Sequence, residues 1–415
     1  MTLQNGPAPE PPGPASTSGV PLAGHWASSL AAGPQVCGTP AEHRPAAGKR
    51  AAPRLISLFS GCGGLDLGFE KAGFRRVWAN DHDPDAQRVY ELNLGPIDPR
   101  NILDVDASEI PDGEMLAAGF PCQPFSNAGN RGGVRDSRGM LYKECLRIIA
   151  SKAPSAVLFE NVKGLLSTRD QEGRLVADTI EDDLDALGYR VSRELVNAAD
   201  YGVPQNRQRV FFVGVRKELG RRFDFPPGTE GGGRTLKTVL RMPRGVPNQA
   251  VMPLSPLQSH MVGFIPEGGS WKDVPDDALP RRFLKIRGDM KRYHSPNFYR
   301  RFSRNEICGT ITASAQPENC GIIHPTEDRR FSIREIARIQ TFPDGFLFLD
   351  GTGRDVAAMY KVIGNAVPVK LARALASALM DQVFGRARPG GPRTRSGGGT
   401  AGASGLRSRA PKPVR

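Results

Sequence analysis

Between residues 54 and 216, short apolar runs alternate with stretches in which apolar residues recur at helical spacing. Side chains repeat every two residues along a strand and about every 3.6 along a helix, so the two patterns predict different elements. Strands that alternate with helices are typical of a mainly parallel sheet with helices on both faces, an α/β fold. The expected strands are 55–59, 76–79, 115–119, 156–159, 189–196 and 209–215, and the expected helices are 65–73, 84–94, 139–150 and 174–187.

After residue 217 the periodicity weakens, because proline and glycine recur throughout the segment. A helix is predicted at 332–340, where Ser332 can cap the N-terminus and Glu335 completes a capping box. A last helix is predicted at 368–383, and we expect it to pack against the first region. The expected division is therefore a leader 1–53, a large domain 54–216, a smaller loop-rich domain 217–344, a returning segment 345–384 and a tail 385–415.

The two ends of the chain differ in composition from the rest. Residues 1–53 are rich in Pro, Ala, Gly and Ser, and residues 385–415 in Gly, Arg and Pro, so both are predicted to be disordered. The 415 residues include 56 Lys and Arg against 43 Asp and Glu, a formal net charge of +13. The tail carries +8 of this charge and residues 54–384 only +4. A polyanionic partner is indicated, but net charge alone does not locate its site.

Apolar length and cysteine spacing exclude several classes of protein. No apolar run approaches the roughly 20 residues that a membrane-spanning helix needs, and the N-terminus has no secretory signal pattern. The six cysteines form no Cys-x-x-Cys pair, so neither a metal site nor a disulfide framework is expected. We therefore expect a cytoplasmic protein with no membrane contact and no metal.

A glycine-rich turn, Phe59-Ser60-Gly61-Cys62-Gly63-Gly64, joins the first expected strand to the first expected helix. Glycines at such a turn let a ligand approach the backbone beside a helix N-terminus. Asp81 follows Gly61 by twenty residues, where a carboxylate can accept hydrogen bonds from ribose hydroxyls. A nucleoside-containing cofactor is thus predicted, although a turn that serves only packing has the same glycines. The G-x-G-G spacing departs from the dinucleotide pattern, and Asn101 in the next turn can approach an adenine.

Cys122 lies in a proline-flanked loop, Pro121-Cys122-Gln123-Pro124, after the strand expected at 115–119. Ligands of open α/β sheets bind at this edge, and a thiolate is a strong nucleophile. A buried, inert thiol is the commoner fate of a single cysteine, and this is our interpretation of the other cysteines.

Charged side chains lie at the end of one further expected strand and at the start of another. Glu160 follows the run 156–159, where a partly desolvated carboxyl can act as a general acid or merely cap a helix. Arg207 and Arg209 lie at alternate positions before the run 210–213, suited to a phosphate or a carbonyl, or to solvent.

Seven segments, taken in order, resemble the DNA (cytosine-5)-methyltransferases found in bacteria. The resemblance covers about 54–384 and leaves both ends outside it. It implies a Rossmann-like methyltransferase sheet with a smaller loop-rich target-recognition domain. The segments are Phe59 to Gly64, Asn80-Asp81, Pro121-Cys122-Gln123, Glu160-Asn161-Val162, Gln205 to Arg209, Arg334 to Pro343, and Gly364-Asn365-Ala366-Val367-Pro368.

The resemblance implies transfer of a methyl group from S-adenosylmethionine to carbon 5 of a cytosine flipped out of double-stranded DNA at a short specific sequence. Cys122 would add to carbon 6, Glu160 would bind ring N3, and Arg209, assisted by Arg207, would hold the base. Asn101-Ile102 departs from the usual acid at the adenine site. The residues expected at the cofactor are Phe59, Gly61, Cys62, Gly63, Gly64, Leu65, Asp81, His82, Asn101, Ile102, Pro121, Asn365 and Ala366.

The segment that would recognise the DNA sequence is rich in basic and aromatic residues between 281 and 304. Such residues suit phosphate contacts and base readout, whereas a solvated charged face is the plainer alternative. The resemblance also implies a monomer, with or without a companion restriction endonuclease. Two other hypotheses stay open: a tRNA-type RNA cytosine-5 methyltransferase, and a DNA-binding module without catalysis.

Overall fold

The computed structural model describes residues 51–121, 139–170, 172–228, 234–288, 297–314, 316–349 and 353–385. It contains a six-stranded sheet in the order β2-β1-β3-β4-β6-β5. Strands β1 to β4 pair in parallel, and β6 is antiparallel to both β4 and β5, so the prediction of a mainly parallel sheet is confirmed. The strands are β1 (Arg54–Leu58), β2 (Arg75–Asn80), β3 (Met115–Ala118), β4 (Ala156–Val162), β5 (Tyr189–Asn197) and β6 (Gln208–Arg216).

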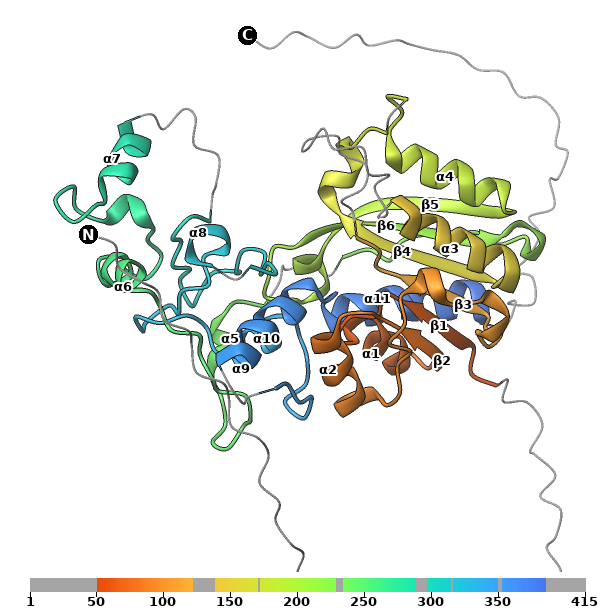
Figure 1. Cartoon of the computed structure of the whole chain (residues 1–415), viewed down its shortest axis with the longest axis horizontal. Helices are drawn as coiled ribbons and strands as arrows, with labels where there is room; N and C mark the ends of the chain where they lie inside the picture. Colours follow the sequence, from red (N-terminus) through yellow and green to blue (C-terminus); the bar gives the residue numbers. More distant parts are fainter. Residues whose placement is uncertain are drawn as a thin grey trace, which may run out of the picture. The chain divides into compact units, whose positions relative to one another are not determined.

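The helices of the sheet region match the predicted ones closely, and Figure 1 shows them on both sides of the strands. Alternate residues of β3 explain this arrangement. Leu116 packs in one cluster with Ile148 of α3 and Ile180 of α4, whereas Ala117 packs in another with Phe69 of α1 and Leu375 of α11. These helices are α1 (Gly64–Lys71), α2 (Pro84–Leu94), α3 (Gly139–Lys152), α4 (Val176–Ala186) and α11 (Val369–Leu379).

Helix α11 packs against α1, although α1 ends at Lys71 and α11 begins only at Val369. A Cβ added at Gly68 of α1 would lie 2.3 Å from Cβ of Ala372, so the two helices approach closely at this point. A π-helical turn, Met380–Phe384, continues α11. The stretch Asp355–Phe384 is long and apolar enough to span a membrane by length and composition, but 72% of its most apolar window is buried inside the protein. Burial of this extent is typical of a core helix, so the stretch is only weak evidence for a membrane span.

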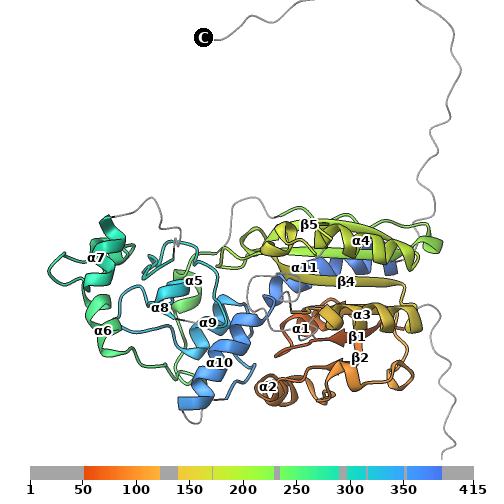
Figure 2. The ribbon, with the colours of Figure 1, turned by 45° about the horizontal axis from the view of Figure 1, so that its top comes forward.

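The described residues of the loop-rich region after β6 form helices, short turns and isolated bridges but no strand, and Figure 2 shows this region at the end of the molecule away from the sheet. The predicted capping box of α9 is present, because Ser332 accepts from the Glu335 backbone and Glu335 from that of Ser332. Helix α10 and the helices before α9 were not predicted. The bounds are α5 (Lys237–Leu240), α6 (Pro256–Gly263), α7 (Arg281–Gly288), α8 (Pro317–Cys320), α9 (Ile333–Ile339) and α10 (Gly353–Asn365).

Candidate active site

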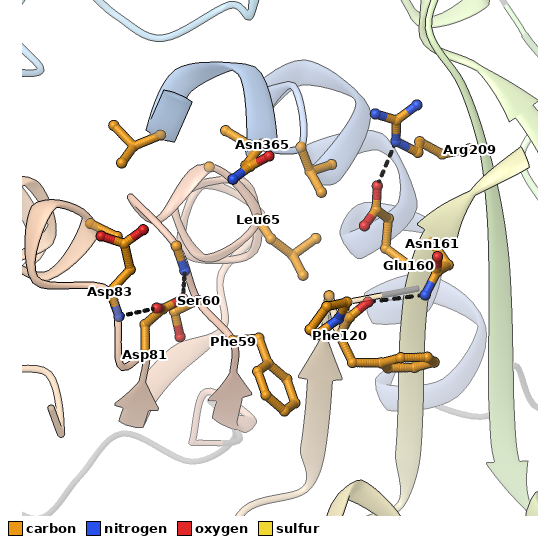
Figure 3. A pocket seen from close by; sticks show the side chains of 18 of the residues that line it. Phe59, Ser60, Leu65, Asp81, Asp83, Phe120, Glu160, Asn161, Arg209 and Asn365 are labelled. Carbon is orange, nitrogen blue, oxygen red and sulfur yellow. Dashed lines mark hydrogen bonds and ion pairs between the residues drawn. The ribbon is translucent and has the colours of Figure 1, made fainter. Parts of the chain in front are cut away.

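A cavity of about 390 Å³ lies at the carboxyl edge of the parallel strands. Its walls come from the turns after β1, β2 and β3, the ends of β4 and the start of β6, and the junction of α10 with α11 (Figure 3). Six sequence-distant segments therefore meet at the edge where open α/β sheets bind ligands. We call this space the site cavity.

The glycine-rich turn and Asp81 form one end of the site cavity. Gly63 has φ +87°, a conformation that L side chains rarely adopt, and it is the N-cap residue of α1. The Gly61 N–H donates to Asp81 Oδ2 (2.8 Å) and the Asp83 N–H to Asp81 Oδ1 (2.9 Å). Burial raises the pKa of Asp81, while these two hydrogen bonds lower it. Each carboxylate oxygen has a further lone pair, so Asp81 can still accept bonds from a ligand.

A second buried carboxylate supports the turn from below. Asp66 of α1 accepts from Ser57 Oγ (2.6 Å) and from the Tyr90 hydroxyl, and Ser60 Oγ donates to Ser57 Oγ (2.8 Å). Burial raises the pKa of Asp66 to about 6. The chain of hydrogen bonds thus ties Ser60, which lines the site cavity, to α1 and α2.

Glu160 and Arg209 occupy the opposite end of the site cavity. Arg209 Nε lies 3.1 Å from Glu160 Oε1, and both side chains are largely buried. Beside them, Asn161 Nδ2 donates to the carbonyl of Phe120 (3.0 Å). This bond fixes the chain two residues before Cys122, and Figure 3 shows Phe120, Asn161 and Glu160 together. The arrangement holds a carboxyl and a guanidinium next to the start of the cysteine loop.

Arg207 lines the site cavity but directs its guanidinium into the protein. Its side chain is 1% exposed. Nη1 donates to the carbonyls of Ile311 (2.9 Å) and Gly364 (3.0 Å), and Nη2 to that of Asn365 (3.3 Å). Burial, and then the charge of Arg209, lower the pKa of this guanidinium. The two arginines that the sequence placed side by side therefore have different partners.

Most of the residues predicted for the site line one cavity. They are Phe59, Gly61, Gly64, Leu65, Asp81, His82, Pro121, Glu160, Arg207, Arg209, Asn365 and Ala366. Cys122 itself lies outside the described residues. The described lining also includes residues that the sequence did not single out as site residues: Ser60, Asp83, Ala86, Gly119, Phe120, Asn161, Val162, Val362 and Val367. Nearly all are sequence neighbours of predicted residues, whereas Val362 comes from the unpredicted α10.

Four residues predicted to bind the cofactor are not among the described residues that line the site cavity: Cys62, Gly63, Asn101 and Ile102. Cys62 is buried beneath the turn, where its thiol donates to the Val362 carbonyl (3.5 Å) and burial raises its pKa to about 12. Asn101 instead caps the short turn Ile102–Asp104 through a bond from the Leu103 N–H. A cofactor role for these four stays a prediction.

Many of the described basic and aromatic side chains between residues 281 and 304 have partners inside the protein, and a DNA-contacting role for this segment stays a prediction. Arg301 is buried and binds the Val262 carbonyl and Asp328. Phe283, Phe298 and Tyr299 pack edge to face in a cluster around Trp271. Three more arginines pair with carboxylates: Arg287 with Asp276, Arg300 with Glu306 and Arg304 with Glu267. The exposed cations of the described α7 are Arg281, Arg282 and Lys285.

Solved structures share this fold. A prophage-encoded protein of E. coli, described as a DNA modification methyltransferase, covers 80% of this chain and all of its own at a TM-score of 0.58 and 24% identity. The S. pombe Dnmt2 methyltransferase covers 79% of this chain and 98% of its own at a TM-score of 0.55 and 21% identity. At these identities the likeness establishes a methyltransferase fold.

The chain belongs to the C-5 cytosine-specific DNA methylase family, whose family model matches residues 53–381. Two relatives come from Neisseria gonorrhoeae. The Type II methyltransferase M.NgoFVII is 37% identical over 78% of this chain and 86% of its own length, and M.NgoPII is 36% identical over 79% and 95%. The Fusobacterium nucleatum M.FnuDI is 35% identical over 79% and 94%. This chain is thus a DNA cytosine-5 methyltransferase.

Enzymes of this family use S-adenosylmethionine as methyl donor. The site cavity fits that cofactor, because it combines a buried carboxylate at a strand end with a glycine-rich turn at a helix N-terminus. Asp81 retains lone pairs for ribose hydroxyls, and Phe59, Leu65 and Val367 supply apolar surface.

Proposed function

We propose that this enzyme methylates carbon 5 of a cytosine that it flips out of a DNA duplex at a short specific sequence, through a transient bond to Cys122. The observation that carries the proposal is the pairing of Glu160 with Arg209 near Phe120, whose carbonyl Asn161 binds two residues before Cys122. This pair lies in the same site cavity as the turn and Asp81. A base stacked in the duplex cannot reach such an interior site, so the target nucleotide must rotate into it.

The roles of the residues follow from their chemistry. The Cys122 sulfur forms a bond to ring carbon 6, which moves an electron pair toward carbon 5 while Glu160 holds a proton at N3. Arg209 orients Glu160 and binds the base carbonyl oxygen. S-adenosylmethionine, when bound, supplies the methyl group that carbon 5 accepts. The carbon-5 proton then leaves to solvent, the Cys122–carbon 6 bond breaks, and the ring double bond is restored.

The setting of the enzyme is part of the same proposal. Its relatives are named Type II methyltransferases, so we infer a modification enzyme of a restriction-modification system, or one without a companion endonuclease. We further propose a cytoplasmic monomer, and the domain division into 54–216, 217–344 and 345–384 stays a prediction. An RNA substrate is not favoured, since the relatives at 35–37% identity are Type II methyltransferases.

Bisulfite sequencing of DNA from cells that express the enzyme tests the activity and identifies the target together. We expect 5-methylcytosine in one short sequence context, and its complete loss in Cys122→Ala. Cys145→Ala is the matched control, because that cysteine is buried on α3 away from the site cavity. Methylation by Cys122→Ala would overturn the covalent step. In a second assay the purified enzyme is incubated with S-adenosylmethionine that carries a labelled methyl group. Transfer of the label to tRNA rather than to duplex DNA would contradict the proposal that DNA is the substrate.

A further inference from the structure

Arg207 connects three segments that are far apart in the sequence. It directly precedes β6, and its guanidinium reaches Ile311 across 104 residues and Gly364 across 157. A planar guanidinium presents several donors in fixed directions, so its three bonds specify the relative positions of the carbonyls that it binds. A lysine ammonium has no such fork.

Other hydrogen bonds join two of the same segments independently of Arg207. Gln205 Oε1 accepts from the Ile311 N–H (2.9 Å), and the Asn206 N–H donates to the Cys308 carbonyl (2.8 Å). A Cβ added at Gly364 would lie 2.4 Å from the Thr312 carbonyl oxygen, closer than any side chain can approach. Segment 308–313 therefore cannot shift without moving Gly364 or breaking the bonds of Arg207.

The two segments that Arg207 connects border different cavities. At one end, Asn365 is exposed and lines the site cavity with Asp83 and Val362. At the other end, Thr310 lines a polar depression of about 460 Å³ that it shares with Lys163, Asn206 and Arg209. Cationic and amide side chains around an open depression beside the base-binding pair suit the DNA backbone.

We propose that Arg207 is a positioning residue that couples DNA binding at segment 308–313 to cofactor binding at Asn365. This inference rests on the proposed function, since it takes DNA as the ligand of the depression. When DNA fixes Thr310 and Ile311, the bonds of Arg207 fix the Gly364–Asn365 backbone at the cofactor side. Because coupling between two binding equilibria is reciprocal, each ligand then tightens the other by the same factor.

The test compares Arg207→Lys with Arg334→Lys. Arg334 is as deeply buried and also binds several carbonyl oxygens, but it is not among the described residues of either cavity. Calorimetry measures the Kd of S-adenosylhomocysteine with and without a duplex that carries the sequence found by bisulfite sequencing. We expect DNA to tighten binding at least about fivefold in the wild type and in Arg334→Lys, and less than about twofold in Arg207→Lys.

Three outcomes would overturn the inference. DNA could fail to tighten cofactor binding in the wild type, it could tighten binding in Arg207→Lys by the same factor as in the wild type, or both variants could lose the tightening equally. If Arg207→Lys does not fold, hydrogen exchange of the wild type decides. DNA without cofactor must then slow the exchange of amides 363–366, and unchanged exchange contradicts the coupling. Methylation by the wild type is assayed in parallel, because its absence contradicts the proposed function instead.

Discussion

The sheet region and the loop-rich region satisfy their buried backbone groups by different means. In residues 54–216 the strands pair through backbone ladders, and most of the residues packed between the sheet and its helices are apolar. The described part of 234–349 has isolated bridges but no strand, and arginine side chains bind several of its carbonyls. Arg334 binds those of Pro247, Pro343 and Phe346, and Arg338 those of Val239 and Arg241.

This difference changes how basic residues are interpreted in a DNA-binding enzyme. A guanidinium has five donors and no acceptor, so it can satisfy several loop carbonyls where no ladder exists. In the loop-rich region a high arginine content therefore reflects folding and is not by itself evidence of DNA contact. Arg301 and Arg334 are buried, whereas Arg281 and Arg282 are exposed and free of that folding role.

The comparison predicts its largest effect at Arg334. Arg334→Met removes the donors to three carbonyls and to Asn248 Oδ1, at about 1–3 kcal/mol for each buried acceptor left unsatisfied. We expect the free energy of unfolding in urea to fall by about 5 kcal/mol. Ile56→Val in the sheet core is the control, with an expected loss of about 1 kcal/mol. An equal loss of unfolding free energy in the two variants would show that the hydrogen bonds of Arg334 do not take the place of strand pairing in this region.

A second effect belongs to Asp66, the buried carboxylate of the sheet region. Its folded pKa of about 6 lies above the unfolded value of 3.8. Its contribution to stability is therefore fully present below pH 3.8 and is lost as the pH rises to about 6, a loss of about 3 kcal/mol. We expect Asp66→Asn to abolish this decline in unfolding free energy between pH 4 and 6. Asp98→Asn is the control, because Arg100 lowers the pKa of Asp98. The contribution of Asp98 to stability therefore increases as the pH rises, whereas that of Asp66 decreases. An unchanged decline in Asp66→Asn would contradict the assignment.

The same contrast explains which features could be predicted from the sequence. The strands and their helices follow from local periodicity. The rule that ligands bind at the carboxyl edge pointed to Glu160, the spacing from Gly61 to Asp81, and the alternation before the last strand to Arg209, and these three residues line one cavity. The arginine bonds could not be predicted, because Arg207 and Gly364 are 157 residues apart. Helix α10 was missed although Val356, Met359, Tyr360 and Ile363 recur at helical spacing, since the glycine-rich segments beside it mask the pattern.

A third, smaller effect is expected where α1 meets α11. Gly68→Ala places a methyl group 2.3 Å from Cβ of Ala372, and the backbone of residues 372 and 373 lies within 3 Å of it. Overpacking of this kind costs typically 1–3 kcal/mol, so we expect a loss of about 2 kcal/mol in thermal unfolding. Gly188→Ala is the comparison, because it strains the backbone without a steric clash. Gly188 has φ +89°, and a Cβ added there would have no heavy atom within 4 Å. If only Gly188→Ala destabilises the protein, the close approach of α1 and α11 is not what holds the returning helix.

The smallest effect concerns the exposed cations of α7. Arg282 lies over the Phe283 ring, with 4.6 Å from its guanidinium carbon to the ring centroid, and its charge faces solvent. A phosphate contact of one cation contributes about one unit to the salt dependence of DNA binding. We expect Arg282→Ala to weaken DNA binding less than tenfold, to lower the salt slope by about one, and to change the unfolding free energy by under about 0.5 kcal/mol. Arg287→Ala is the matched variant on the same helix, because Arg287 binds the carbonyls of Trp271 and Val274. Arg287→Ala should lower the unfolding free energy and leave the salt dependence of DNA binding unchanged. If the two variants show the reverse, burial does not distinguish arginines that stabilise the fold from arginines that bind DNA.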